Sequence, residues 1–404
     1  MNIRVSVSGY GAVTPYGVGV KSSFSGLLQG RDVYRTATGL DLADDYFSQK
    51  KIAEIPDALI DEHNLSWDLH PHADATKLTL MALEEALAQA KLSTDRLSQR
   101  RVGVAITTLE SHVLEALAVM MQDYTSAIDA ALMNLVDPEY CLQEIRNLTG
   151  AAGAGMVLSN ACASGNHAIA AGVDLIRSGE VDLAIVGGGC KIFQSAVVGF
   201  HQFQGISPDT CRPFSGNRSG TMLGDGAGIL ILESRDYARD RGFDPMIDIA
   251  GYGTSCDAYD MMAPHPEGLG MKLAMQRALE MADLKPDAIQ YINAHGTATF
   301  QNDRLETMSI RRVFGHHADQ LMVSSTKSLL GHSLYAASAL EAVWCCCALE
   351  HGQIPPTMNY ETADQECDLN YVVNQSRIAD VSCCMNNSFG FGGSNSSVIF
   401  CKVD

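Results

Sequence analysis

The sequence lacks an uninterrupted apolar run of about 18 residues, and its first residues show no charged segment followed by an apolar core. We therefore expect neither a membrane span nor export, and a cytoplasmic location. Basic residues are also scarce, since 28 Lys and Arg face 47 Asp and Glu for a formal net charge of −19. Without a basic stripe that could displace counterions, the composition argues against a nucleic-acid partner.

None of the 12 cysteines forms a Cys-x-x-Cys pair. Adjacent cysteines at 345–347 and 383–384 stand inside apolar runs, where a thiol packs as a small hydrophobic side chain. This pattern fits a reducing compartment better than a disulfide framework, and it makes a structural zinc site improbable. The sequence thus predicts no metal.

The second half of the chain repeats features of the first half in the same order. Both halves hold a strand-like run ending Gly-Tyr-Gly (9–11 and 251–253), a helix opening with Lys-Leu (from 77 and 272) and a Ser-rich loop before a helix (159–165 and 324–331). We interpret this as a duplicated α/β unit with halves at residues 1–235 and 236–404. The Gly-Tyr-Gly triplet of the first half is read as a turn.

Apolar periodicity predicts the elements between these landmarks. Strands are expected at 4–8, 101–107, 181–186, 229–232, 246–253 and 289–294, and helices at 75–91, after Cys162, from 272 and at 334–349. The glycines 187–189 follow the strand at 181–186, and a loop region is expected after them. The Met- and Ala-rich stretch 110–148 is expected to be helical and to form core or a subunit interface; a wall for a long apolar substrate, with Met120, Met121 or Met133, is the alternative.

Cys162 lies where a short apolar run breaks into small residues, just before the helical pattern resumes. A thiol at a helix start meets unpaired N–H groups and the positive end of the helix dipole. Both favour the thiolate, so we expect Cys162 to be a nucleophile with a lowered pKa. A buried structural cysteine is the alternative.

Three loops of the second half carry polar side chains suited to acid–base chemistry. His295 follows a buried strand, Lys327 and His332 stand in a loop before a helix, and residues 390–393 form a Gly-rich turn. If the halves are duplicates, the Cys162 loop and the His332 loop face each other. We then expect one thiol and two imidazoles to converge, with N–H groups of the Gly-rich turn facing them.

Taken together, the chain resembles the β-ketoacyl synthases of the thiolase superfamily over almost its whole length. The motifs that carry the resemblance stand in the family's order: 161–165 (ACASG), 295–299 (HGTAT) with Asp303 and Glu306, 326–332 (TKSLLGH) and 388–395 (SFGFGGSN), with further support from 212–214 and 223–228. The resemblance implies a layered αβαβα thiolase fold with no cofactor. It also implies decarboxylative condensation of an acyl chain with a malonyl unit, both carried on acyl carrier protein.

The resemblance assigns a role to each matching residue. Cys162 would hold the acyl chain, and His295 and His332 would stabilise the enolate of the malonyl unit. Lys327 would give electrostatic support, with Glu341 as its ion partner. The backbone N–H groups of Cys162 and Phe391 would form an oxyanion hole. The remaining implied positions are the gating and substrate residues Phe391, Phe389, Thr297, Thr299 and Gly392, and the supporting residues Asp303 and Glu306.

Several positions depart from the family pattern. Tyr335 and Ser338 stand where glycines are usual, Ser219 and Thr221 replace an Asp and a Phe, and Asn160 stands where Thr is common. These departures favour a specialised type II polyketide or polyene synthase over a fatty-acid enzyme. The resemblance also implies a homodimer, or a heterodimer with a chain-length-factor paralogue.

Three other functions stay open: a non-catalytic or partner-dependent chain-length-factor subunit, a thiolase and a cysteine thioester hydrolase. The presence of Cys162 with both histidines argues against the first, and Phe391 in place of a second cysteine argues against the second. An acidic carrier would need a basic patch on this acidic chain. Its candidates are Lys50, Lys51, Arg96, Arg100 and Arg101.

Overall fold

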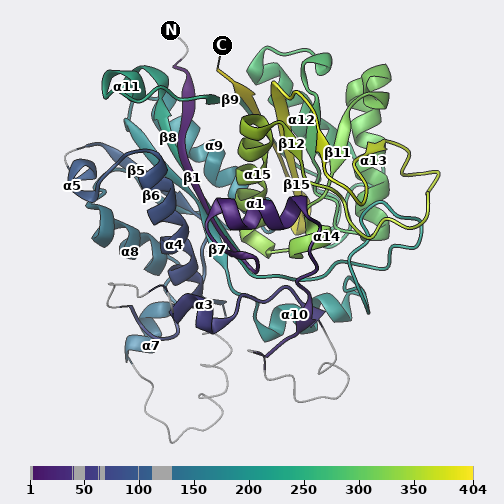
Figure 1. Ribbon diagram of the computed structural model, residues 1–404, viewed down its shortest axis with the longest axis horizontal. Helices are drawn as coiled ribbons and strands as arrows, with labels where there is room; N and C mark the ends of the chain where they lie inside the picture. The colour runs from purple at the N-terminus through teal and green to yellow at the C-terminus, as the bar shows by residue number, and fades with distance from the viewer. Residues whose placement is uncertain are drawn as a thin grey trace, which may run out of the picture.

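A computed structural model describes residues 3–38, 40, 51–61, 63, 69–98, 100–111 and 130–403. In this part of the chain, strands and helices alternate around one large sheet (Figure 1). The strands are β1 (Val5–Thr14), β2 (Gly17–Val18), β3 (Arg35–Thr36), β4 (Lys51–Ile52), β5 (Val102–Ile106), β6 (Gly155–Val157), β7 (Leu183–Cys190), β8 (Gly226–Ser234), β9 (Ile247–Cys256), β10 (Tyr291–Asn293), β11 (Met322–Ser324), β12 (Gln353–Ile354), β13 (Asn370–Tyr371), β14 (Arg377–Ile378), β15 (Cys383–Gly390) and β16 (Ser394–Lys402).

Four short 3-10 segments accompany the α-helices; they are η1 (Pro286–Ala288), η2 (Gly315–Asp319), η3 (Leu334–Ala336) and η4 (Phe391–Gly393). The helices are α1 (Val20–Leu28), α3 (Asp57–Asp61), α4 (Asp74–Gln89), α5 (Thr94–Leu97), α7 (Ala130–Leu135), α8 (Tyr140–Thr149), α9 (Ser164–Arg177), α10 (Gln194–Gln202), α11 (Arg235–Asp240), α12 (Leu269–Ala282), α13 (Phe300–Phe314), α14 (Lys327–Leu330) and α15 (Ala337–His351). Within these residues, no helix combines the length and the apolar character needed to cross a membrane.

The strand order of the 12-stranded sheet reads the same outward from its centre in both directions. On one side of the central pair, β1 is followed by β8, β7, β5 and β6; on the other side, β9 is followed by β16, β15, β10 and β11. In both arms the two innermost pairings are antiparallel and the outer ones parallel. The fold class expected from the sequence is confirmed, whereas the boundary between residues 235 and 236 stays a prediction.

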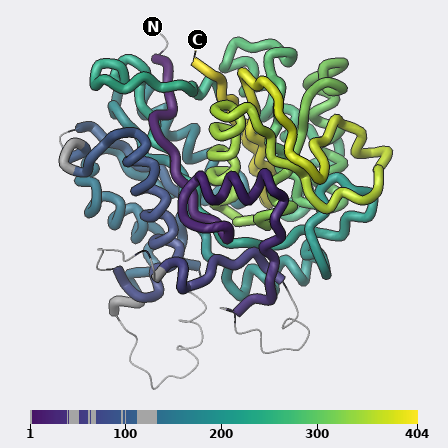
Figure 2. The backbone as a smooth tube through the Cα atoms, viewed as in Figure 1, coloured from purple at the N-terminus to yellow at the C-terminus, as the bar shows by residue number. Residues whose placement is uncertain are grey.

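Helices cover both arms of the sheet and fill the space between them. Helices α9 and α15 pack against each other and against strands of both arms, while α4 covers β1 and β8, and α12 covers β9 and β16. Figure 2 shows the blue segments on the left and the green and yellow segments of the late residues on the right, while the purple N-terminal segment crosses the middle of the view. This arrangement gives the five layers of the αβαβα fold.

The Gly-Tyr-Gly triplets lie inside β1 and β9, so the expected turn at residues 9–11 is wrong. Because their glycines lack side chains, a helix can pack directly against the backbone of each strand. A Cβ at Gly11 would lie 2.0 Å from the carbonyl oxygen of Ala82 in α4, and a Cβ at Gly253 would lie 2.1 Å from that of Ala274 in α12. The two halves therefore share one device for seating a helix on the sheet.

The glycines at 187–189 belong to β7, which continues through them to Cys190, beyond the strand end expected at residue 186. Their lack of side chains makes room for neighbouring backbone and threonine side chains. A Cβ at Gly188 would lie 2.8 Å from the Thr107 methyl group, and one at Gly189 would lie 2.6 Å from the Thr79 hydroxyl. Periodicity alone does not separate such a glycine strand from a turn.

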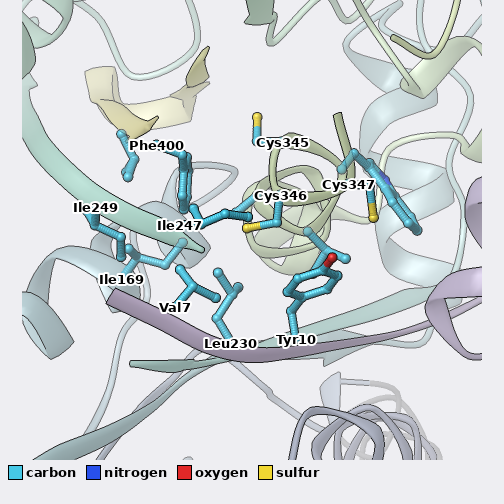
Figure 3. Packing of buried hydrophobic residues seen from close by; sticks show 14 of the residues in the cluster. Val7, Tyr10, Ile169, Leu230, Ile247, Ile249, Cys345, Cys346, Cys347 and Phe400 are labelled. Carbon is cyan, nitrogen blue, oxygen red and sulfur yellow. The ribbon is translucent and has the colours of Figure 1, made fainter. Parts of the chain in front are cut away.

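The cysteine run 345–347 is buried in α15, as its apolar setting predicts. Figure 3 shows Cys346 and Cys347 on the side of the helix that faces Tyr10 and Leu230, from the paired strands β1 and β8, while Cys345 points away from them. Cys383 differs from the other adjacent cysteines, since it forms a disulfide with Cys401 directly across the β15–β16 pair. The sequence offers no spacing rule for such a cross-strand pair.

Only part of the stretch 110–148 belongs to the described residues, where α7 and all but the last residue of α8 confirm helix. Met120 and Met121 lie outside the described residues. Met133 is exposed in the single chain, so nothing in the described structure assigns it to a substrate wall.

Candidate active site

Cys162 lies two residues before α9, as the sequence predicts. Its turn is held by Ser164, whose hydroxyl accepts a hydrogen bond from the Asn160 N–H at 2.7 Å and donates one to the Ala161 carbonyl at 2.6 Å. Ala161 has a φ of 49°, a left-handed conformation that is uncommon outside glycine. The tight turn leaves the Cys162 side chain 7% exposed, at the inner end of a pocket.

His332 is the nearest acid–base partner of Cys162. Its Nε2 lies 3.0 Å from the Cys162 Sγ, within hydrogen-bond range. The loop that carries His332 follows α14 and bridges to Leu223, and the His332 N–H donates to the Met222 carbonyl at 2.7 Å. The thiol and the imidazole are therefore placed to exchange a proton.

His295 approaches from the end of β10, the sheet edge expected from its position after a buried strand. Both carboxylate oxygens of Glu306 hold its loop, accepting from the N–H groups of His295 at 2.9 Å and Gly296 at 2.8 Å. One donor atom from each of Cys162, His295 and His332 lies within 4.8 Å of the others. The convergence of one thiol and two imidazoles, predicted from three separate loops, is confirmed.

Burial decides the protonation of this cluster. The pKa values of His295 and His332 are well below 6.5, first because burial disfavours the imidazolium and second because the Lys327 ammonium is near. Burial also raises the pKa of the Cys162 thiol to about 11, although Lys327 and the N–H groups of Phe391 and Cys162 act in the opposite direction. The expected lowering of this pKa by the helix start is wrong, because desolvation outweighs it.

Lys327 and Glu341 form a buried ion pair behind the cluster, as the resemblance implies. Burial raises the pKa of Glu341 to about 7, while the Lys327 charge acts to lower it. Lys327 supplies a positive charge near the thiol and both imidazoles, and at the thiol Glu341 acts against it. The Lys327 charge favours a neutral imidazole and a thiolate over the alternative protonation states.

The turn between β15 and β16 closes the site on the side of Phe391. Phe391 opens η4, and its N–H lies close enough to the Cys162 thiol to favour the thiolate. A Cβ at Gly390 would lie 3.0 Å from the Cys162 nitrogen, so a side chain at this position would press on the Cys162 backbone. Gly392 has a φ of 75°, and its N–H donates to the Met261 carbonyl. The Phe389 ring packs edge-on to His295 at 5.9 Å.

The loop between β10 and α13 holds Thr297 and Thr299, and Asp303 stands in the first turn of α13. The two threonine hydroxyls lie 2.9 Å apart and line the pocket. Asp303 is buried and accepts from the N–H groups of Phe214 at 2.7 Å and Ala298 at 3.2 Å, so it ties this loop to the segment before β8. Asp303 thus supports the backbone of the loop and does not reach the thiol.

The pocket that ends at Cys162 has a volume of about 560 Å³, within the range of small-molecule sites. Sequence reasoning missed Phe200 and Phe203, which also line it. The Phe200 ring lies 5.5 Å from the ring of Phe391 and 6.3 Å from that of His332. The sequence signal for these two residues was the spacing Phe-x-x-Phe at 200–203, within an expected loop region. That spacing gives no indication that the two rings lie near Cys162.

Cys162, His295 and His332 also form a possible ligand set for a soft divalent ion, since thiolate and imidazole are its usual ligands. The side chains that surround these three residues do not complete a metal site. Lys327 places a positive charge beside it, and the carboxylate of Glu306 is occupied by two backbone N–H groups. The donor set therefore fits acid–base and nucleophilic chemistry better than a resident metal.

Comparison with known proteins covers the chain almost from end to end. The family models "Beta-ketoacyl synthase, N-terminal domain" and "Beta-ketoacyl synthase, C-terminal domain" match residues 2–238 and 246–361. The chain is 36% identical to Nodulation protein E of Rhizobium leguminosarum bv. trifolii, covering 100% of both chains. It is 33% identical to 3-oxoacyl-[acyl-carrier-protein] synthase 2 of Staphylococcus aureus, covering 100% of this chain and 99% of the relative.

Solved structures of ketosynthases also superpose on this chain. The ishigamide ketosynthase/chain length factor superposes with a TM-score of 0.93 at 34% identity and full coverage of both chains. A ketosynthase in complex with its chain length factor from Xenorhabdus doucetiae superposes with a TM-score of 0.83 at 28% identity, covering 99% of this chain and 98% of that one. Sequence, fold and the convergent thiol–imidazole cluster agree, and the chain belongs to the β-ketoacyl synthase family.

Proposed function

We propose that the chain is a 3-oxoacyl-[acyl-carrier-protein] synthase, an acyltransferase that joins an acyl chain to a malonyl unit with loss of CO2. The single observation that carries the proposal is the Cys162 thiol 3.0 Å from the His332 imidazole, with His295 in the same cluster. The names of relatives such as 3-oxoacyl-[acyl-carrier-protein] synthase 2 support the substrate class.

The first half-reaction loads the acyl chain. The Cys162 thiol loses its proton and attacks the thioester carbonyl of the acyl-carrier protein; a C–S bond forms to Cys162, and the carrier thiol leaves with a proton. The raised thiol pKa makes a base necessary, and His332 is within reach of the proton. The N–H groups of Cys162 and Phe391 would bind the oxyanion, a contribution typically worth about 2.7–4 kcal/mol for one donor.

The second half-reaction forms the carbon–carbon bond. The malonyl thioester loses CO2 as its C–C bond breaks, and the electron pair becomes an enolate whose oxygen accepts hydrogen bonds from His295 and His332. The enolate carbon then attacks the Cys162 thioester, and the C–S bond breaks to free the Cys162 sulfur, which regains a proton. Neutral imidazoles suit this role because the N–H group of each ring can donate a hydrogen bond to the oxyanion.

Supporting roles follow from the contacts described above. Lys327 with Glu341 would hold positive charge beside the sulfur, and Glu306 and Asp303 would fix the His295 loop. Phe391, Phe389 and Gly392 would form the gate of the pocket, where Thr297 and Thr299 offer hydroxyls to the incoming thioester. The proposed location is the cytoplasm, and the pathway is fatty acid or specialised type II polyketide synthesis.

The proposed partners are acyl carrier protein and a second ketosynthase-like subunit, either a copy of this chain or a chain-length-factor paralogue. A solved complex of a type II acyl-carrier protein with its ketosynthase, bound to the hexaketide, superposes on this chain with a TM-score of 0.90 at 28% identity. That likeness, with the chain length factor complexes, supports both kinds of partner.

Intact-protein mass tests the proposal directly. The purified chain is mixed with a panel of acyl-carrier thioesters, with Cys162→Ala and Cys256→Ala beside the wild type. Cys256 is an exposed cysteine and controls for adventitious labelling. An acyl adduct on the wild type and Cys256→Ala, but not on Cys162→Ala, is expected. Equal labelling of all three proteins would contradict the proposal, and the preferred acyl group would identify the pathway.

A further inference from the structure

Four large apolar side chains stand exposed around the mouth of the Cys162 pocket. Phe203 and Phe300 line its outer part, and Met261 is joined to the Phe391 turn through the hydrogen bond from Gly392 to its carbonyl. Tyr259 stands on the same loop as Met261, with its ring 5.1 Å from that of His265. We call Phe203, Tyr259, Met261 and Phe300 the apolar rim. Exposed apolar side chains that gather in one place commonly mark a binding surface.

The rim is held in an exposed position by its own neighbours. The Phe300 ring is 61% exposed, yet the Arg218 guanidinium lies 4.9 Å from its centroid on the inner side. Arg218 itself is buried and paired with Asp364 at 2.5 Å. The cation–π contact thus fixes an aromatic surface toward solvent, which lowers the entropy lost when a partner covers it.

Positive charge near the rim is paired with acidic side chains. Arg218 beneath Phe300 pairs with Asp364, and Arg304, four residues further along α13, pairs with Glu366. None of the described residues that line the pocket is Lys or Arg, and Asp257 is the charged one among them. Of the basic candidates named from the sequence, Arg101 pairs with Asp182 ahead of β5, the Arg100 guanidinium lies over the Tyr237 ring, and Lys51 is exposed on β4 and does not line the pocket. An acidic partner therefore finds few ionic contacts at this mouth.

Resting on the proposed function, we infer that the apolar rim is the docking surface for acyl carrier protein and that it recognises an apolar face of the carrier. The acyl group must enter the pocket and reach Cys162 while it is still tethered to the carrier, so the carrier must settle at the mouth. An apolar, aromatic surface supplies the buried anchors that dominate protein interfaces. Docking on this acidic chain consequently depends on apolar contact and not on charge pairing.

Variants of the rim separate docking from chemistry. Tyr259→Ser and Met261→Ser, two rim positions whose side chains do not line the pocket, are combined, and Ile378→Ser serves as the matched control because Ile378 is 83% exposed on β14, away from the pocket. The rate of Cys162 acylation is measured with one acyl group on the carrier and on N-acetylcysteamine, a small soluble thiol. The ratio of the two rates should fall about tenfold in the rim variant and stay unchanged in the control.

A fall of equal size with both thioesters would overturn the inference, because the rim would then act on the chemistry. Normal acylation with an unchanged ratio would overturn it as well. A change in oligomeric mass on light scattering, with the same loss, would make the rim a subunit interface and would also overturn docking. Failure of both thioesters to acylate the wild type would instead count against the proposed function.

Salt gives an independent measurement on the wild-type protein. Surface charges are screened beyond about 10 Å at about 0.1 M salt and beyond about 3 Å at about 1 M. If the rim carries docking, the KM for the acyl-carrier protein should change less than about twofold between low and high salt across that range. A rise in KM of about tenfold would overturn the inference and point to basic side chains such as Lys51.

Discussion

The loop before α9 and the loop before α15 take matching places in the two arms of the sheet, yet they carry different side chains. The first loop follows β6 and presents Cys162; the second follows β11 and presents Lys327 and His332. Because α9 and α15 pack side by side, the two loops meet at one point. A duplicated framework thus becomes an asymmetric site, with a sulfur from one half and the acid–base groups from the other.

The surroundings of the two central helices differ as well. Helix α15 is buried from Ala337 to Leu349, whereas α9 is exposed at Asp174 and half-exposed at three other positions. The charged groups of the second loop therefore lie in a medium where an unpaired charge is costly, and Lys327 has a partner in Glu341. Burial acts at the first loop too, where it keeps the sulfur of Cys162 protonated at neutral pH.

The largest effect is expected from removing the acid–base groups of the second half. His295→Ala and His332→Ala should each lower condensation by up to about 10⁴-fold, because the enolate oxygen loses a donor. Acylation of Cys162 should persist in part, more in His295→Ala, since His332 is the residue that contacts the sulfur. Single-turnover formation of the β-ketoacyl product measures the first effect, and intact mass measures the second.

The exposed His316 provides the control, and His316→Ala should behave as the wild type. If condensation were unchanged in either histidine variant, that residue would have to be removed from the mechanism. If acylation and condensation fell equally in His295→Ala, the division of labour between the two halves would be wrong.

Breaking the buried Lys327–Glu341 ion pair tests how much an unpaired charge in the second loop lowers the free energy of unfolding. Lys327→Met should lower the free energy of unfolding by up to about 3–5 kcal/mol at alkaline pH, because it strands the Glu341 carboxylate. Burial already raises the pKa of this group in the folded wild type to about 7. Without Lys327 the folded pKa rises further, so Glu341 is protonated in both folded proteins below about pH 7, and the loss should be small there and grow as the pH rises above about 7.

Urea unfolding across pH measures this loss. The double variant Lys327→Met/Glu341→Leu should recover most of the stability, since no buried charge remains. Lys402→Met is the matched control, because its pair with Asp380 is exposed and worth at most about 1 kcal/mol. Equal losses in the two lysine variants would refute the idea that burial sets the cost.

The reactivity of Cys162 tests whether burial, or the helix start together with Lys327, has the larger effect on the pKa of its thiol. With a thiol pKa of about 11, the thiolate fraction should increase about tenfold for each pH unit from pH 7 to pH 9, and alkylation by iodoacetamide should follow it. The measurement uses Cys256→Ala, which removes an exposed competing thiol. A rate that levels off below pH 8 would mean that the helix start and Lys327 outweigh burial.

The convergence of Cys162, His295 and His332 could be predicted because each residue stands where a strand ends or a helix begins, and the repeat relates the loops. The direction of the pKa shift of the Cys162 thiol could not be predicted, because it depends on how deeply the turn is buried. Phe300 gives a similar lesson. Its exposure and its contact with Arg218 arise from segments some 80 residues apart, which no local pattern connects.

The triplets Gly-Tyr-Gly show the same limit in the fold. Their recurrence indicated the duplication, but the local rule that glycine marks a turn gave the wrong element. The missing fact was the position of α4 and α12 above them, a tertiary relation in which glycine is required for close approach. Repeats in a sequence therefore report the architecture more securely than the conformation of each repeated residue.

The smallest effect is expected from these glycines, and it tests whether the two halves are built alike. Gly11→Ala and Gly253→Ala should each cost about 1–3 kcal/mol in the free energy of unfolding, because the added methyl group meets a helix carbonyl oxygen at 2.0 Å and 2.1 Å. Gly199→Ala in α10 is the control; its nearest neighbour lies 3.9 Å away, and alanine favours the helix by up to about 1 kcal/mol. Losses of similar size in both halves, with none in the control, would agree with a shared helix seat. A loss confined to one half would mean that only that helix is held tightly against the sheet.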